Sequence, residues 1–163
     1  MNAETQEMGS PGPALGEVLD FMRLVWRLDH ALQRRSKRME QSLGVTGPQR
    51  LVLRIVGRFP GIPAGHLAHL LHVHPSTLTG VIKRLERQHL LRKRADPRDA
   101  RRGLLSLTDR GRAIDAVSEG TVEAAVRDGL SRVSARDVDA VRRVLTALAE
   151  KLEETSGGRG QIL

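Results

Sequence analysis

The chain has 163 residues, of which 39% are hydrophobic, so it is long enough for one domain with a core, and wholesale disorder is excluded. It carries 27 Lys and Arg against 19 Asp and Glu, and its net charge of +8 favours a polyanionic partner, nucleic acid ahead of an anionic membrane surface. It has no cysteine, which excludes disulfides, thiol catalysis and cysteine-ligated zinc. The three aromatic residues are too few for a single-strand binder that stacks bases.

The ends of the chain carry no targeting or membrane signal. No apolar run approaches the roughly 18 residues that a membrane span needs, and no basic segment precedes an apolar one at the N-terminus. We therefore expect a cytoplasmic protein without a signal peptide and without a membrane partner. Residues 1–13, rich in Gly, Pro and Ser, are predicted to be a flexible arm, and the glycine-rich residues 155–163 a flexible tail.

A long helix is predicted from residue 15 to residue 43, where apolar residues recur at helical spacing, and Gly44 is expected to end it. This helix has two displaced apolar stripes, and a second subunit can bury one of them. The first stripe contains Leu15, Val18, Leu19, Met22 and Trp26, and the second contains Phe21, Leu24 and Leu28.

Three shorter helices are predicted next. Thr46 and Gln49 form a capping-box pattern that opens a helix through Val56. Phe59-Pro60-Gly61 breaks the chain, and a further helix is expected from Pro63 to about Leu71. Pro75 fits the first position of another helix, which extends to about Gln88.

The helix at residues 75–88 divides into an apolar face and a polar face. Leu78, Val81, Ile82 and Leu85 lie on the first. The opposite face presents Ser76, Thr79, Gly80, Lys83 and Arg87, flanked by Arg84. Short hydroxyls, a glycine and long cations allow a helix to approach a phosphate-lined groove and to reach base edges.

A basic β-hairpin is predicted to follow, with strands at 90–95 and 103–107 and a turn at 96–99. Residues 83–102 hold nine basic and three acidic side chains, a net charge of +6, which leaves +2 for the other 143 residues. Beyond the hairpin, one helix is expected from 109 towards 130. Another follows the cap at Ser134, with an apolar seam at Val138, Val141, Leu145, Leu148 and Leu152.

The stretch from Thr46 to Gly111 resembles the MarR family of bacterial transcriptional regulators. The matching pieces are TGPQRLVLRIV (46–56), HLAHLLHVHPSTLTGVIKRLE (66–86), ADPRDARR (95–102) and LLSLTDRG (104–111). The resemblance implies a mainly α fold with a small β-hairpin wing, in which a winged helix-turn-helix sits on a helical dimerisation platform. The DNA-binding domain would span 45–108, and the platform 14–44 and 109–154.

What the resemblance implies functionally is a homodimer on double-stranded DNA with a pseudo-palindromic site, most simply a repressor released by a small-molecule effector. Ser76, Thr77, Thr79, Lys83 and Arg84 match recognition-helix contact positions, and Arg87 shares their exposed face. Thr77 is expected to be shared with the core. In the wing, Asp99 and Arg101 match an acid–arginine pair whose arginine enters the minor groove. Arg98 and Arg102 are expected at phosphates, and Arg101→Ala is expected to weaken operator binding. His89 stands where the family usually has glycine, which predicts a positive φ there.

The sequence does not identify the effector or its binding site. Trp26 and His30, with Asp29 and Gln33 beside them, continue an apolar stripe and are candidates for a ligand pocket, but intersubunit hydrogen bonds or simple exposure explain them as well. Arg23, Arg27 and Arg50 are candidates to balance an anionic ligand. The absence of cysteine excludes thiol-based peroxide sensing.

Two alternatives from other classes are weighed against this prediction. His66 and His69 have the spacing of two metal ligands, which leaves a zinc-responsive regulator of the same fold open, although ordinary surface or cap histidines explain them without a metal. A nonspecific basic nucleic-acid-binding protein would fit the isoelectric point but not the concentration of charge on one helix and one hairpin. No phosphate-binding glycine loop or hydrolase motif indicates an enzyme, and no cofactor is required.

Overall fold

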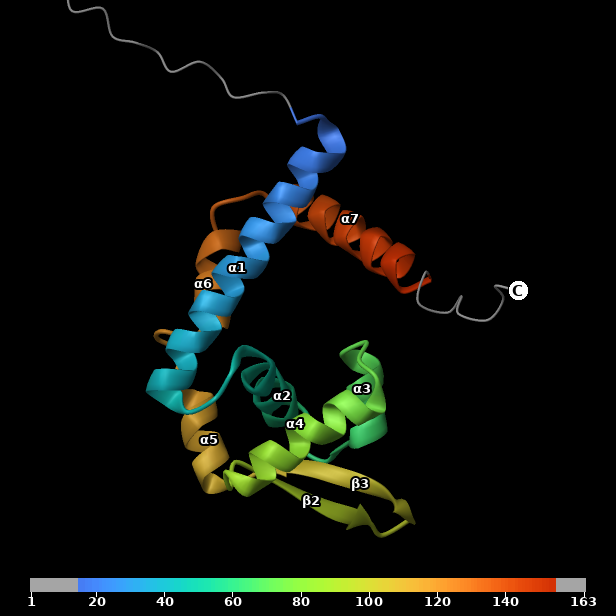
Figure 1. Cartoon of the computed structure of the whole chain (residues 1–163). Helices are drawn as coiled ribbons and strands as arrows, with labels where there is room; N and C mark the ends of the chain where they lie inside the picture. Colours follow the sequence, from blue (N-terminus) through green and yellow to red (C-terminus); the bar gives the residue numbers. More distant parts are fainter. Residues whose placement is uncertain (1–14, 155–163) are drawn as a thin grey trace, which may run out of the picture.

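The computed structural model describes residues 15–154, so the predicted arm at 1–13 and tail at 155–163 lie outside the described residues. The elements are α1 (Glu17–Leu43), α2 (Gly47–Arg58), β1 (Ile62–Pro63), α3 (Ala64–Leu70), α4 (Pro75–Arg87), β2 (Leu91–Asp96), β3 (Asp99–Leu107), α5 (Asp109–Ala116), α6 (Val122–Leu130) and α7 (Ala135–Glu154). The three strands form an antiparallel sheet in the order β1-β3-β2 (Figure 1). The mainly α fold with a β-hairpin wing is confirmed.

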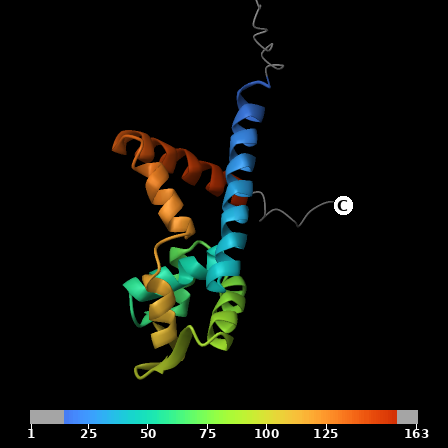
Figure 2. The ribbon, with the colours of Figure 1, turned by 90° about the vertical axis from the view of Figure 1, so that its left-hand side faces the viewer.

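The core lies where α2, α3 and α4 pack against the sheet. Its fully buried side chains include Leu53 of α2, Leu67 of α3, Leu85 of α4 and Leu105 of β3. From this compact unit α1 extends upward, and α6 and α7 lie beside it at the same end of the molecule (Figures 1 and 2). Within residues 15–154, α1, α6 and α7 thus lie at one end of the molecule, and α5 packs with α2 and β3 at the other end.

The junction between α1 and α2 follows the predicted capping pattern. Gly44 adopts the left-handed conformation with φ of 73°, and its N–H donates to the carbonyl oxygen of Glu40 at 2.9 Å. The Thr46 hydroxyl accepts from the Gln49 N–H at 3.4 Å, while the Gln49 side-chain oxygen accepts from the Thr46 N–H at 2.9 Å. This reciprocal capping box satisfies two otherwise unpaired donors at the start of α2.

The single helix predicted from 109 to 130 is wrong, because the structure divides it into α5 and α6. Gly120 has φ of 72°, which is incompatible with a continuous helix. Thr121 then starts a new helix, since its hydroxyl accepts from the Ala124 N–H at 3.2 Å. Residues 117–121 (VSEGT) hold one apolar residue and end in Gly120-Thr121, a helix-stop and helix-start signal that the prediction of one helix did not use.

Two smaller corrections concern the sheet. Ile62 and Pro63 form a short strand that pairs with Leu105 and Leu104 of β3, so the third helix begins at Ala64 and not at Pro63. Pro63 is compatible with an edge strand, where its missing N–H is not needed. In the hairpin, Asp96 pairs with Asp99 and Ala95 pairs with Gly103, so the register shifts and residues 100–102 form a bulge.

The long helices keep most of their apolar surface exposed. Met39 is the one buried residue of α1, and α7 has none. The exposed set on α1 includes Leu15, Val18, Leu19, Phe21, Met22, Leu24, Val25, Trp26, Leu28 and Leu32, and that on α7 includes Val141, Val144, Leu145, Leu148 and Leu152. Within residues 15–154, no helix has the length and hydropathy needed to span a membrane.

Candidate nucleic-acid interface

Helix α4 is fixed in the core by its apolar face and capped by a histidine. Leu78, Ile82 and Leu85 are buried, as predicted. The His74 ring nitrogen Nδ1 accepts from the Ser76 N–H at 3.3 Å and lies 2.7 Å from the Ser76 hydroxyl oxygen. Because Pro75 occupies the first helical position, α4 begins at a defined point and presents a defined face.

The polar face of α4 is exposed to solvent. Its exposed residues are Ser76, Thr77, Thr79, Gly80, Lys83, Arg84 and Arg87. Thr77 belongs to this face and is not shared with the core, so that expectation is wrong. Gly80 has no side chain, and a Cβ added there would contact nothing within 4 Å. The backbone of α4 is therefore uncovered at the centre of this face. This combination suits close approach to a groove wall.

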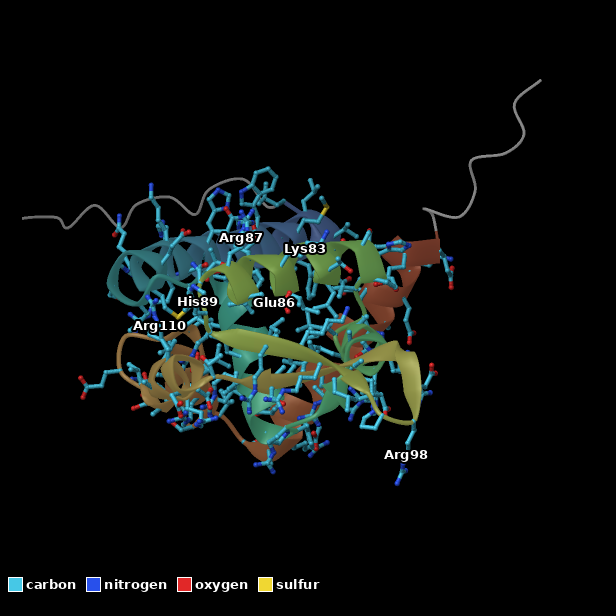
Figure 3. The ribbon with its side chains drawn as sticks, turned by 90° about the horizontal axis from the view of Figure 1, so that it is seen from below. Lys83, Glu86, Arg87, His89, Arg98 and Arg110 are labelled. Carbon is cyan, nitrogen blue, oxygen red and sulfur yellow. The ribbon has the colours of Figure 1, made fainter. Side chains whose placement is uncertain are left out.

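The wing presents basic side chains beside α4. The Arg98 N–H donates to the Asp96 carboxylate at 2.9 Å, which closes the turn, and Arg102 Nε lies 3.7 Å from Asp99 Oδ2. Arg101 lies in β3, and its side chain is not among those that the structure describes. Seen from below, Lys83 and Arg87 project from α4 and Arg98 projects from the wing tip (Figure 3). Lys83, Arg87 and Arg98 of the predicted set thus lie on two elements that are seen together in this view.

Arg50 joins the winged unit to α6, and sequence reasoning did not predict this role. Its guanidinium is 2% exposed and donates to the Glu123 carboxylate from Nε at 2.8 Å and from Nη2 at 2.6 Å. It also donates to the carbonyl oxygens of Ile114 at 2.5 Å, Asp115 at 3.2 Å and Val117 at 2.5 Å. Arg50 therefore caps the C-terminal end of α5, where the last carbonyl groups of a helix lack a full set of donors from the helix itself.

The Arg50 network occupies most donors of one candidate for ligand binding, although Arg50 also lines a cavity between α1, α2 and α6. Its side chain uses its donors within the protein, so the expectation that Arg50 balances an anionic ligand is not supported by its contacts. The signal for its structural role was present in the sequence. Arg50 precedes Leu53 by one helical turn on the buried side of α2, and a buried arginine requires charged or carbonyl partners.

The Glu123 carboxyl group has a perturbed pKa. Burial raises the pKa, but the hydrogen bond and charge of Arg50, the backbone N–H of Glu123 and the charge of Arg54 together hold it below its usual value of 4.5. Because the pKa is depressed in the folded state, this interaction contributes its full stability above pH 4.5 and loses it as the pH falls further.

We expect Glu123→Gln to weaken the acid sensitivity of folding. The free energy of unfolding, measured by urea denaturation between pH 7 and pH 3, should fall less steeply below about pH 4.5 in the variant than in the wild type. Glu119→Gln, at an exposed position before α6, is the matched control and should keep the wild-type profile. An unchanged acid limb in Glu123→Gln would contradict the assignment.

A cavity of about 1290 Å³ opens between α1, α2 and α6. Its apolar wall includes Leu32, Leu51, Val122, Val126 and Leu130, and its charged rim includes Asp29, Arg34, Lys37, Glu40, Arg54, Glu123 and Arg127. Trp26 and His30 are not among its lining residues. Trp26 is 67% exposed on α1, and its indole N–H donates to the His30 ring at 3.3 Å.

The histidines of α3 and the following turn are exposed. His69 and His72 have ring centroids 6.2 Å apart, and His66 lies one turn earlier on α3. Among the described residues, no group of three His, Asp or Glu side chains comes together in a way that could hold a metal ion. His89 has φ of 55°, which confirms the conformation predicted at the end of α4.

Comparison with known proteins relates the winged unit to one family. Residues 45–102, which include α2 to the wing, match the model of the MarR family. The winged unit is therefore similar to the corresponding part of MarR-family proteins. A curated MarR-type relative, the organic hydroperoxide resistance transcriptional regulator of Bacillus subtilis (strain 168), is 27% identical over 136 residues, which is 80% of this chain and 88% of the relative.

Further similarities include the flanking helices. An HTH-type transcriptional repressor of Mycobacterium tuberculosis (strain ATCC 25618 / H37Rv) is 29% identical over 125 residues, covering 77% of this chain and 90% of the relative. The crystal structure of MarR superimposes with a TM-score of 0.60 at 26% identity and covers 91% of this chain and 99% of MarR. The winged-helix fold on long flanking helices is thus that of MarR regulators.

Proposed function

We propose that the protein is a sequence-specific transcriptional regulator that places α4 in the major groove of double-stranded DNA and the wing in the adjacent minor groove. The observation that carries the proposal is the exposed polar face of α4, where hydroxyls and cations surround Gly80 next to a basic wing. The relatives named above are a transcriptional regulator and a transcriptional repressor. Repression is the simplest mode, because a protein across a promoter blocks polymerase.

The active form is proposed to be a homodimer. Helices α1 and α7, of 27 and 20 residues, have one buried residue between them and leave a large number of apolar side chains exposed, which favours burial against a partner. A second copy of the chain supplies the same surface in complementary orientation. Two recognition helices related by a two-fold axis require half-sites about one helical turn apart in a pseudo-palindrome.

Analytical ultracentrifugation tests the homodimer. The wild type should sediment as a dimer, whereas Leu145→Glu places a charge in the apolar face of α7 and should shift the protein towards monomer. Arg143→Gln, also on α7, is the control and should remain dimeric. A monomeric wild type would overturn this part of the proposal.

The cavity between α1, α2 and α6 is the proposed effector site. Its apolar wall and its basic residues Arg34, Lys37, Arg54 and Arg127 suit a small amphipathic anion. An effector bound there lies between the winged unit and the long helices, so it acts through different affinities for different spacings of the two recognition helices. Because the chain has no cysteine, thiol oxidation is not the signal. No zinc or other cofactor is proposed.

Selection of duplexes from a randomised DNA library by the purified protein tests the function. Recovery of one inverted repeat, with half-sites about a helical turn apart, is the expected result. The logarithm of affinity should fall by about 0.9 per phosphate contact for each unit in the logarithm of salt concentration. Tight, salt-sensitive binding without any consensus would instead indicate a nonspecific nucleic-acid-binding protein.

We expect Gly80→Ala to move stability and DNA binding in opposite directions. The added methyl meets open space, so helix propensity should raise the free energy of unfolding by about 0.5–1 kcal/mol. The same methyl stands between α4 and the groove, so affinity for the selected operator should fall. Gly65→Ala on α3 also adds a methyl in open space and is the control. Undiminished operator affinity in Gly80→Ala would place the contact face elsewhere on α4.

A further inference from the structure

The chain directly after α4 is fixed to the start of α5 by two hydrogen bonds of Thr108. The Thr108 hydroxyl donates to the carbonyl oxygen of His89 at 2.6 Å, and the Thr108 N–H donates to the carbonyl oxygen of Leu90 at 3.2 Å. The same hydroxyl accepts from the Gly111 N–H at 3.0 Å and caps α5. The first turn of α5 therefore holds a fixed position relative to the recognition helix.

Arg110 is the side chain that this junction leaves available. It is exposed, and no hydrogen bond or ion pair within the described residues involves its guanidinium. Arg112 in the same turn is occupied, because it donates to the Leu107 carbonyl oxygen at 3.1 Å and pairs with Asp109. Of the two arginines in this turn, Arg110 is thus free of intramolecular partners among the described residues, whereas Arg112 is not.

The charges around Arg110 are mainly positive. His89 and Arg110 lie together at one end of the face seen from below, with Arg87 near them on α4, while Arg98 lies at the opposite end (Figure 3). The acidic groups nearby are Glu86, which is half-buried on α4, and Asp109, which is paired with Arg112. An anion approaching this end meets exposed cationic side chains.

We propose that Arg110 binds a backbone phosphate of DNA. Each protomer then contacts the DNA backbone on both sides of the major groove, through the wing and through Arg110. This inference rests on the proposed function and adds a contact to it. Arg98 and Arg110 lie beyond the two ends of β3, and a nine-residue strand at 3.3 Å per residue spans about 26 Å between its first and last residues. That span is at most the ideal-strand length and is shorter than the roughly 34 Å of one helical turn, so it is compatible with two backbone contacts around one half-site.

The test is the salt dependence of binding, measured by fluorescence anisotropy on the selected operator and on an unrelated duplex of equal length. Arg110→Gln should weaken binding to both duplexes by about three- to tenfold and reduce the slope of log affinity against log salt by about 0.9. Arg110→Lys, which keeps the charge, should restore most of the slope. Arg136→Gln is the control, since Arg136 is exposed at the start of α7, at the other end of the molecule (Figure 1).

The outcomes separate this inference from the proposed function. If Arg110→Gln keeps the wild-type affinity and salt slope while Lys83→Gln has a reduced salt slope, the Arg110 contact is overturned and the proposed DNA-binding function is not. An equal loss in Arg110→Gln and Arg136→Gln would reduce the effect to net charge and would also overturn it. Failure of the wild type to bind duplex DNA would overturn the proposed function and this inference with it.

Discussion

Arg50→Ala is expected to lower the free energy of unfolding by about 3–5 kcal/mol, because it removes one partner from a buried ion pair. The substitution removes the Arg50 donors from the carbonyl oxygens of Ile114 and Val117, and that of Ile114 keeps the Val117 N–H. It also leaves the Glu123 carboxylate without its main partner in a partly buried position. Each buried polar group left unpaired carries a desolvation penalty that a small alanine side chain cannot offset.

Urea denaturation of Arg50→Ala, followed by circular dichroism, measures this loss. Arg54→Ala is the matched control, since Arg54 lies one turn later on α2, contacts Asp115 and Glu123, and is 44% exposed. Exposed ion pairs contribute about 0–1 kcal/mol, so the control should lose no more than that. Equal losses in the two variants would show that burial of Arg50 does not matter. Arg50→Lys should recover little, because an ammonium group cannot reproduce the planar set of donors.

The elements of the winged unit were predictable because local rules and tertiary packing agree there. The capping box at Thr46, the proline at the start of α4 and the apolar spacing of Leu78, Ile82 and Leu85 each act within a few residues. The polar face of α4 followed from the same spacing. The sequence therefore predicted which side chains of the polar face of α4 are exposed. The exception is Thr77, which was expected to be shared with the core.

The parts that were missed depend on contacts between distant residues. The break between α5 and α6 depends partly on Arg50, which is more than 60 residues away in the sequence and satisfies the carbonyl groups that the break releases. The strand at Ile62 exists only because β3 lies beside it. Arg110 carries no sequence signal, since its availability depends on the position of α5 against the end of α4.

Gly111→Ala is expected to lower the free energy of unfolding by about 2–3 kcal/mol, because its methyl group would overlap the carbonyl oxygen of Leu90. The obstacle is backbone, so no side-chain rotation relieves the overlap. The chain must instead move α5 away from residues 89–90, which stretches the hydrogen bonds of Thr108 to His89 and Leu90.

Gly129→Ala is the control for Gly111→Ala, because it should change the free energy of unfolding in the opposite direction. Gly129 lies in α6 with open space around it, so alanine should stabilise the protein by up to about 1 kcal/mol through helix propensity alone. Urea denaturation compares the two variants, and hydrogen exchange at the Thr108 amide should accelerate in Gly111→Ala only. Equal free energies of unfolding in the two variants, with a protected Thr108 amide, would contradict the prediction. They would show that the extra methyl group does not move α5 away from residues 89–90.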